Sequence, residues 1–174
     1  GLGPDSKIGL YLYNGNEYLE AHYAAFKTRG VPINVNYRYI DEELRYLLDN
    51  ADAEALVFHS SLGDRVERVC KQLPKLKLLI EVDDGTSGQV PGASKYEEVV
   101  ATQQPMPRIT RQESDIYMMY TGGTTGMPKG VMWRHEDLYG TLAEAVYPIL
   151  GAEIPAASAD AGAAALGIVA EGRS

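Results

Sequence analysis

The residues best suited to chemistry stand together between positions 121 and 130, in the segment TGGTTGMPKG. Its ten positions hold four glycines, three threonines and one lysine, Lys129. Glycine lets backbone N–H groups approach an anion without a Cβ in the way, threonine hydroxyls add donors, and lysine adds a mobile positive charge. Each charge-assisted hydrogen bond contributes about 1.5–3 kcal/mol. The segment is therefore predicted to hold a polyphosphate.

Two well-known phosphate patterns do not fit this segment. A Walker loop requires glycine directly before its lysine and serine or threonine after it, whereas Lys129 stands between Pro128 and Gly130. A dinucleotide-binding fingerprint requires glycines at its first, third and sixth positions, and neither Gly122 nor Gly123 starts such a series. The segment therefore indicates another class of phosphate site.

The elements that must position the loop follow from short apolar runs that alternate with segments of helical period. Strands are predicted at residues 8–13, 31–35, 55–58, 76–82 and 116–120. Apolar spacing of three and four predicts helix faces carrying Leu19, Tyr23 and Phe26, then Leu44, Leu47, Leu48 and Ala51, then Val66, Val69, Cys70 and Leu73. A further helix is predicted to begin near His135. Because parallel strands need crossover connections, the chain is predicted to be α/β, with a mostly parallel sheet flanked by helices.

Composition restricts the class of protein. With 174 residues, 45% of them hydrophobic and 23% charged, the chain has the size and make-up of one globular domain. Its formal charge of −8 supplies no net attraction for nucleic acid. No apolar run approaches the roughly 20 residues of a membrane-spanning helix, so no membrane span is expected. The single cysteine, Cys70, fits a reducing, cytoplasmic setting.

The two ends of the chain suggest a fragment of a longer protein. Residue 1 is glycine, and an apolar run follows almost at once. Residues 151–174 hold nine alanines, four glycines and no aromatic residue. We expect residues 1–150 to form part of a domain with the phosphate loop at 120–131, and residues 151–174 to form a loop or a weak helix.

Other reactive side chains are not expected to carry chemistry, and His22 is expected to be a packing or surface histidine. Cys70 falls on an apolar helix face, which favours a buried filler over a nucleophile. His22, His59 and His135 have no cysteine or acidic partner at metal-ligand spacing. Residues 37–39 favour a turn with stacked side chains over a binding patch. No metal site and no catalytic residue is predicted.

The segment Tyr120–Val131, YTGGTTGMPKGV, resembles the phosphate-loop signature of the adenylate-forming enzymes, which include acyl-CoA synthetases, luciferases and the adenylation domains of peptide synthetases. That signature usually has serine where Gly122 stands, so one hydroxyl donor is missing here. Residues 16–38, the run Glu42–Leu44 and the run Trp133–His135 are similar to bacterial fatty-acyl-CoA synthetases.

The resemblance implies part of a large N-terminal domain and a two-step reaction. A carboxylate, a fatty acid in this branch, attacks the α-phosphate of ATP, and the CoA thiolate then displaces AMP. The residues that the resemblance assigns to the ATP phosphates are Thr121, Gly122, Gly123, Thr124, Thr125, Gly126 and Lys129. It also implies Mg²⁺, with ligands mostly outside this chain.

The later motifs of the family do not follow Lys129. They are an acidic motif that contacts adenine and magnesium, a ribose motif, a hinge and a C-terminal catalytic lysine. We therefore expect the chain alone to complete neither half reaction. Two alternatives stay open, a nucleotide-binding module without catalysis and a scaffold fragment that binds nothing alone.

Overall fold

The structure is a computed structural model, and it describes residues 2–86, 88–122 and 126–172. The chain divides into two compact units, Gly1–Met132 and Trp133–Ser174. The boundary falls within a strand, β7 (Lys129–Arg134). Each unit is therefore described by itself.

A five-stranded sheet forms the centre of the first unit. Its strands are β1 (Lys7–Tyr11), β2 (Val31–Asn34), β3 (Ala53–His59), β4 (Leu78–Val82) and β5 (Ser94–Lys95). Their spatial order is β2-β1-β3-β4-β5, and each neighbouring pair is parallel. In β1, for example, Leu10 pairs with Asn34 on one side and Val57 on the other. The predicted α/β class with a parallel sheet is confirmed.

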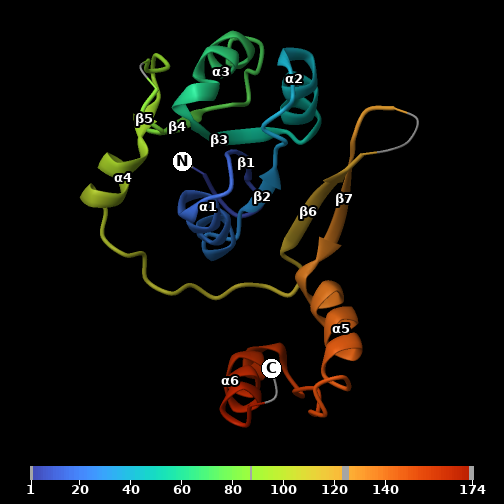
Figure 1. Ribbon diagram of the computed structural model, residues 1–174. Helices are drawn as coiled ribbons and strands as arrows, with labels where there is room; N and C mark the ends of the chain where they lie inside the picture. Colours follow the sequence, from blue (N-terminus) through green and yellow to red (C-terminus); the bar gives the residue numbers. More distant parts are fainter. Residues whose placement is uncertain (1, 87, 123–125, 173–174) are drawn as a thin grey trace. The chain divides into compact units, whose positions relative to one another are not determined.

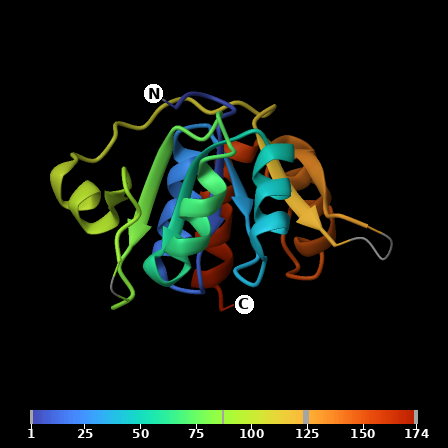
Figure 2. The same cartoon turned by 90° about the horizontal axis from the view of Figure 1, so that it is seen from above.

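Helices cover both faces of this sheet, because the crossovers from β1 to β2, from β2 to β3 and from β3 to β4 each carry one. The described residues between β4 and β5 form no helix. The helices of this unit are α1 (Asn16–Lys27), α2 (Asp41–Asn50), α3 (Gly63–Cys70) and α4 (Tyr96–Thr102), with the short 3₁₀ turn η1 (Ser60–Leu62) before α3. α2 and α3 lie side by side on one face, and α1 lies on the other (Figure 1, Figure 2).

The core beneath α2 and α3 follows the predicted pattern. Leu44, Leu47 and Leu48 are at most 1% exposed, and they pack with strand side chains such as Leu56 and Phe58. Successive residues of a strand point to opposite faces, so their neighbours Ala55 and Val57 belong to the core on the α1 side. Of the predicted helix face that follows β3, Val66, Val69 and Leu73 are buried, whereas Cys70, expected to be a buried filler, is only partly buried.

The predicted buried face of α1 is wrong. Leu19 and Tyr23 are 56% and 59% exposed, whereas Ala25 is only 4% exposed and Ala21 packs beside it against the sheet. The small side chains of Ala21 and Ala25 let the helix approach the strands closely, whereas Leu19 and Tyr23 turn outward. The helix also ends at Lys27, before Gly30.

Several exposed elements were not predicted from the sequence. They are β5, α4 and β7, and each is short or lacks a buried apolar face. The predicted strand near 116–120 is present as β6 (Ile116–Thr121), and β6 and β7 form a separate two-stranded sheet.

After the last residues of β7, the described elements of the second unit are helices. Helix α5 (His135–Val146) begins at the predicted residue. After it come the 3₁₀ turn η2 (Ser158–Asp160) and α6 (Ala161–Ala170), where a loop or weak helix was expected. Among the described residues of both units, no helix combines the length and apolar character needed to cross a bilayer.

Candidate phosphate-binding site

The glycine- and threonine-rich segment connects β6 to β7. Thr121 ends β6 and Lys129 begins β7. A connection this short can join only antiparallel neighbours, so both residues lie at the same end of the hairpin. The predicted site residues Thr121, Gly122, Gly126 and Lys129 are thus brought together, whereas Gly123, Thr124 and Thr125 lie outside the described residues.

The described residues of this loop face solvent. Thr121, Gly122, Gly126 and Lys129 are all exposed. Within the described part of the chain, no ion pair includes Lys129. Its ammonium group is therefore available to an anion without first breaking an internal salt bridge.

Helix α2 holds both ends of the loop. The Tyr46 hydroxyl donates to the Pro128 carbonyl oxygen at 3.3 Å, and the Tyr120 hydroxyl donates to Asn50 Oδ1 at 2.8 Å. Burial, with Tyr46 and Asp52 nearby, raises the pKa of Tyr120, which keeps its hydroxyl a neutral donor at pH 7. The loop is therefore fixed at its base to a helix that packs on the sheet.

These two contacts on α2 were missed in the sequence, although a signal was present. Tyr46 and Asn50 are four residues apart, so they share one side of the helix, away from the buried face of Leu44, Leu47 and Leu48. The spacing of Tyr46 and Asn50 does not indicate which residues they contact. Their contacts follow only from how β6 and β7 pack beside α2.

Gly130 lets the two strands of the hairpin lie close together. A Cβ added there would be 3.2 Å from Tyr120 Cζ and 3.3 Å from Met118 Sδ. The glycine after Lys129 thus has a packing role, and it sets the distance between the lysine and the strand that leads into the loop.

The other candidate side chains lie in packed clusters. The backbone N–H of Tyr13 donates to His59 Nδ1 at 3.1 Å, and the two rings are 5.0 Å apart. His22 packs against Phe26 and Tyr117, with ring centroids 4.9 and 6.0 Å away. Burial lowers the pKa of both histidines, which favours the neutral rings.

Two further expectations concern stacking and metal ligands. The Arg38 guanidinium lies 5.3 Å from the Tyr37 ring centroid, which confirms the predicted stacked turn after β2. Over residues 2–86, 88–122 and 126–172, no group of three or more His, Cys, Asp or Glu side chains is placed to hold a metal ion.

Comparison with known proteins identifies the family of this chain. Residues 1–161 match the family described as AMP-binding enzyme. The chain is 45% identical over 136 residues to the medium-chain acyl-CoA ligase Mig of Mycobacterium avium, which covers 77% of this chain and 25% of that protein. It is 44% identical over 145 residues to the 3-oxocholest-4-en-26-oate–CoA ligase of Rhodococcus rhodochrous, covering 82% and 26%.

Solved structures of CoA ligases are similar in fold to this chain. A long-chain-fatty-acid-CoA ligase from Archaeoglobus fulgidus matches with a TM-score of 0.69 at 28% identity, over 85% of this chain and 29% of that one. An anthranilate CoA ligase matches with a TM-score of 0.72 at 23% identity, over 82% and 27%, and shows likeness of fold alone. The chain spans about a quarter of the length of the curated relatives it matches. The similarity to bacterial acyl-CoA ligases is confirmed, and the chain belongs to the AMP-binding enzyme family.

Proposed function

We propose that this chain is the part of an ATP-dependent acyl-CoA ligase that holds the ATP phosphates. In the first half reaction a carboxylate oxygen attacks the α-phosphorus of ATP, the bond to the bridging oxygen breaks, and pyrophosphate leaves. In the second, the CoA thiolate attacks the acyl carbon and AMP leaves. The observation that carries this proposal is the exposure of Thr121, Gly122, Gly126 and Lys129, in a member of the AMP-binding family.

The loop's task in this reaction is to bind the β- and γ-phosphates. Negative charge develops on pyrophosphate as it leaves, so donors that already point at that position lower the barrier. One such preorganised donor is worth about 10² to 10³ in rate. Lys129 supplies a charge, Thr121 a hydroxyl and Gly122 a backbone N–H, and the Tyr46 and Tyr120 contacts hold the loop's base while this happens.

The substrate proposal rests on the relatives. Their names are those of medium-chain acyl, medium- and long-chain fatty acid and 3-oxocholest-4-en-26-oate CoA ligases. We therefore propose a medium- or long-chain fatty acid as the carboxylate and CoA as the acceptor, in the cytoplasm. Mg²⁺ would arrive with ATP, and we place its protein ligands mostly outside this chain.

The chain would act as one piece of a longer ligase. Support comes from the relatives, of which it spans 25% and 26%. We place residues 1–150 in the large N-terminal domain and residues 151–174 in a separate loop or helical segment. The chain alone is expected to bind phosphate but to complete neither half reaction.

Calorimetric titration of the 174-residue chain with magnesium pyrophosphate and with MgATP tests the phosphate role. We expect Lys129→Ala to weaken binding about tenfold or more, the loss of one charge contact. Lys71→Ala is the matched control, because Lys71 is an exposed lysine directly after α3 whose partner is Glu67. Absence of binding at millimolar ligand, or equal affinity in both variants, would contradict the proposal and favour a scaffold that binds nothing alone.

Binding alone does not separate a ligase from a nucleotide-binding module. Formation of acyl adenylate by the longer protein that contains this chain does so, because a module without catalysis releases no pyrophosphate. Turnover by the purified 174-residue chain would contradict the part of the proposal that makes it one piece of the catalyst.

A further inference from the structure

Over the described residues, the hairpin of β6 and β7 forms a sheet of its own, without a backbone ladder to the central sheet. Alternate residues of β6, namely Ile116, Met118 and Tyr120, pack on the core beneath α2. All six residues of β7 are exposed. The threonine end of the loop, which follows β6, is therefore supported by packing on the core, whereas the lysine end, which begins β7, has no buried side chain of its own strand beside it.

An ion pair fixes the far end of β6. Arg29 Nε and Nη2 donate to Asp115 Oδ1 at 3.0 and 2.8 Å, and the Asp115 side chain is only 8% exposed. Asp115 immediately precedes β6, and six steps of about 3.3 Å along the strand place it about 20 Å from Thr121. The ion pair thus sets where the strand begins, and the orientation of groups in the loop depends on nearer contacts.

At the lysine end of the loop, the nearer contact comes from Tyr46. Its hydroxyl donates to the Pro128 carbonyl oxygen at 3.3 Å. That carbonyl and the N–H of Lys129 belong to one planar peptide group, so the hydrogen bond fixes the plane from which the lysine side chain departs. A lysine whose backbone is already oriented has less freedom to lose when it binds a phosphate.

At the threonine end, the nearer contact comes from Asn50. Its Oδ1 accepts a hydrogen bond from the Tyr120 hydroxyl at 2.8 Å, and Tyr120 is directly followed by Thr121. Tyr46 and Asn50 lie one turn apart on α2, and the leucine face of that helix is buried in the core. One firmly packed helix therefore supports both ends of the loop.

We propose that Tyr46 and Asn50 are positioning residues for the ATP phosphates, and that each acts on a different group. Tyr46 orients Lys129, and Asn50 orients Thr121 through Tyr120. Because each acts through another residue, its effect should disappear when the side chain that it orients is removed. This inference rests on the proposed function, which assigns the phosphates to the loop, and extends that function to helix α2.

A double-mutant cycle on the 174-residue chain tests the role of Tyr46. Phosphorus NMR of inorganic pyrophosphate with Mg²⁺ measures the affinity of the unchanged chain, Tyr46→Phe, Lys129→Ala and the double variant. Tyr46→Phe should weaken binding about 3- to 10-fold, the effect of one hydrogen bond, but less than about twofold in the Lys129→Ala background. The same fold-loss in both backgrounds, or no loss in Tyr46→Phe, would overturn the inference.

A second cycle tests Asn50 in the same way. Asn50→Ala should weaken pyrophosphate binding about threefold or more in the unchanged chain and less than about twofold in Thr121→Val. Asn50→Ala and Tyr120→Phe combined should weaken binding no more than either change alone, since both remove the same hydrogen bond. Additive losses would contradict the assignment of Asn50 to Thr121.

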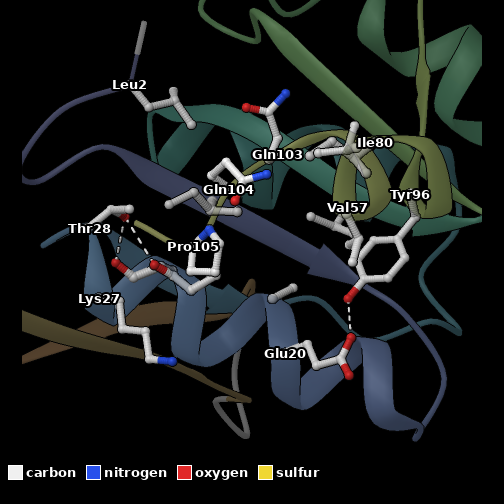
Figure 3. Close-up of a pocket in the computed structure, with 16 residues that line it drawn as sticks. Leu2, Glu20, Lys27, Thr28, Val57, Ile80, Tyr96, Gln103, Gln104 and Pro105 are labelled. Atoms are coloured by element: carbon white, nitrogen blue, oxygen red, sulfur yellow. Dashed lines mark hydrogen bonds between the residues drawn. The ribbon is translucent and has the colours of Figure 1, made fainter. Parts of the chain in front are cut away.

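Tyr96→Phe is the matched control. The Tyr96 hydroxyl donates to Glu20 of α1, beside an apolar groove on the face of the sheet that α1 covers (Figure 3). The change therefore removes one tyrosine hydrogen bond from the same unit without altering α2 or the loop. Pyrophosphate affinity should stay within about twofold of the unchanged chain, and melting temperatures show whether Tyr96→Phe and Tyr46→Phe lose similar stability. Equal losses of affinity in these two variants would indicate a general loss of structure and overturn the positioning role.

Lys129→Ala alone separates this inference from the proposed function. If Lys129→Ala weakens pyrophosphate binding and Tyr46→Phe does not, only the positioning role fails. If the unchanged chain binds no pyrophosphate, or Lys129→Ala binds it equally well, the proposed phosphate role fails and the positioning role fails with it.

Discussion

Gly122 and Gly130, near the two ends of the loop, differ in whether a larger side chain would fit. Gly122 is exposed, and a Cβ built there meets no described atom within 4 Å. A Cβ on Gly130 would instead lie 3.2 Å from the ring of Tyr120, which its hydrogen bond to Asn50 holds in place. Serine, the usual residue of the resembled signature at position 122, is therefore compatible with the backbone there. At position 130, packing requires glycine.

Gly122→Ser should therefore leave the free energy of unfolding within about 0.5 kcal/mol of the starting value, as for other exposed positions. Gly130→Ser should lower it by about 1–3 kcal/mol, since an added side chain forces Tyr120 or Met118 to move. Urea denaturation followed by circular dichroism measures both. A large loss for Gly122→Ser would reveal a backbone constraint at that position.

Asp84 ties the end of β4 to the turn that follows β3. It accepts hydrogen bonds from Ser60 Oγ at 2.7 Å, Ser61 N at 3.2 Å and Thr86 N at 3.2 Å. Burial opposes the charge, but the hydrogen bonds from Ser61, Ser60 and Thr86 outweigh it and lower the pKa of this carboxyl. The ionised form is thus favoured more in the folded chain than in the unfolded one.

The sign of the pH dependence follows from this shift. The folded pKa lies below the unfolded value of about 4, so the contribution of Asp84 is complete above that pH and declines as the pH falls below it. The difference in unfolding free energy between the unchanged chain and Asp84→Asn should shrink between pH 5 and about pH 3. Because Asp84 is exposed, we expect a change of no more than about 1 kcal/mol.

Urea titrations at several pH values provide the measurement. Ser60→Ala, which removes one donor to the carboxylate, should weaken the same pH dependence. A difference between the two chains that is constant from pH 5 to pH 3 would contradict the role given to these hydrogen bonds.

At the scale of elements, the passage from α1 to β2 depends on close approach at Gly30. A Cβ there would lie 2.7 Å from Ile8 Cδ1 and 3.1 Å from the Ser6 carbonyl oxygen. Gly30→Ala should lower the free energy of unfolding by about 1–3 kcal/mol. Gly140→Ala is the control, because Gly140 lies within α5 with no described atom near its added Cβ, and it should raise stability by about 0.5–1 kcal/mol. Equal effects in urea denaturation would contradict the packing argument.

Strongly periodic elements could be predicted from the sequence, and weakly periodic ones could not. The leucines of α2 and the valines of α3 recur at helical spacing because one whole face of each helix is buried. In α1 the packed face is made by alanines, which carry little signal beside the larger and exposed Leu19 and Tyr23. β7 has six exposed residues and therefore no alternation to detect.

Some residues of the candidate site could likewise be predicted from the sequence, and others could not. Its glycines, threonines and lysine could be found because phosphate chemistry restricts residue type at consecutive positions. Its supports, Tyr46 and Asn50, could not be found, because hydrogen bonds between residues 70 and 82 positions apart leave no pattern in sequence spacing. Of β6, the strand before the loop, only Met118 is buried.

For the molecule as a whole, the acidic charge and the phosphate site oppose each other. A formal charge of −8 repels a polyphosphate, so binding must come from the local arrangement of N–H groups, hydroxyls and Lys129. A lysine about 4 Å from a phosphate oxygen contributes on the order of 4 kcal/mol at an effective dielectric near 20. The proposed function requires this attraction between Lys129 and a phosphate oxygen.

Isotope exchange between ATP and pyrophosphate, measured on the proposed longer ligase, tests this contribution of Lys129 most directly, because it reports the adenylation step alone. Lys129→Ala should slow exchange by about 10- to 1000-fold, as expected when one preorganised charge is lost, while Lys71→Ala should leave it unchanged. An exchange rate in Lys129→Ala within about twofold of the unchanged enzyme, a barrier change below about 0.5 kcal/mol, would contradict the phosphate role of the loop.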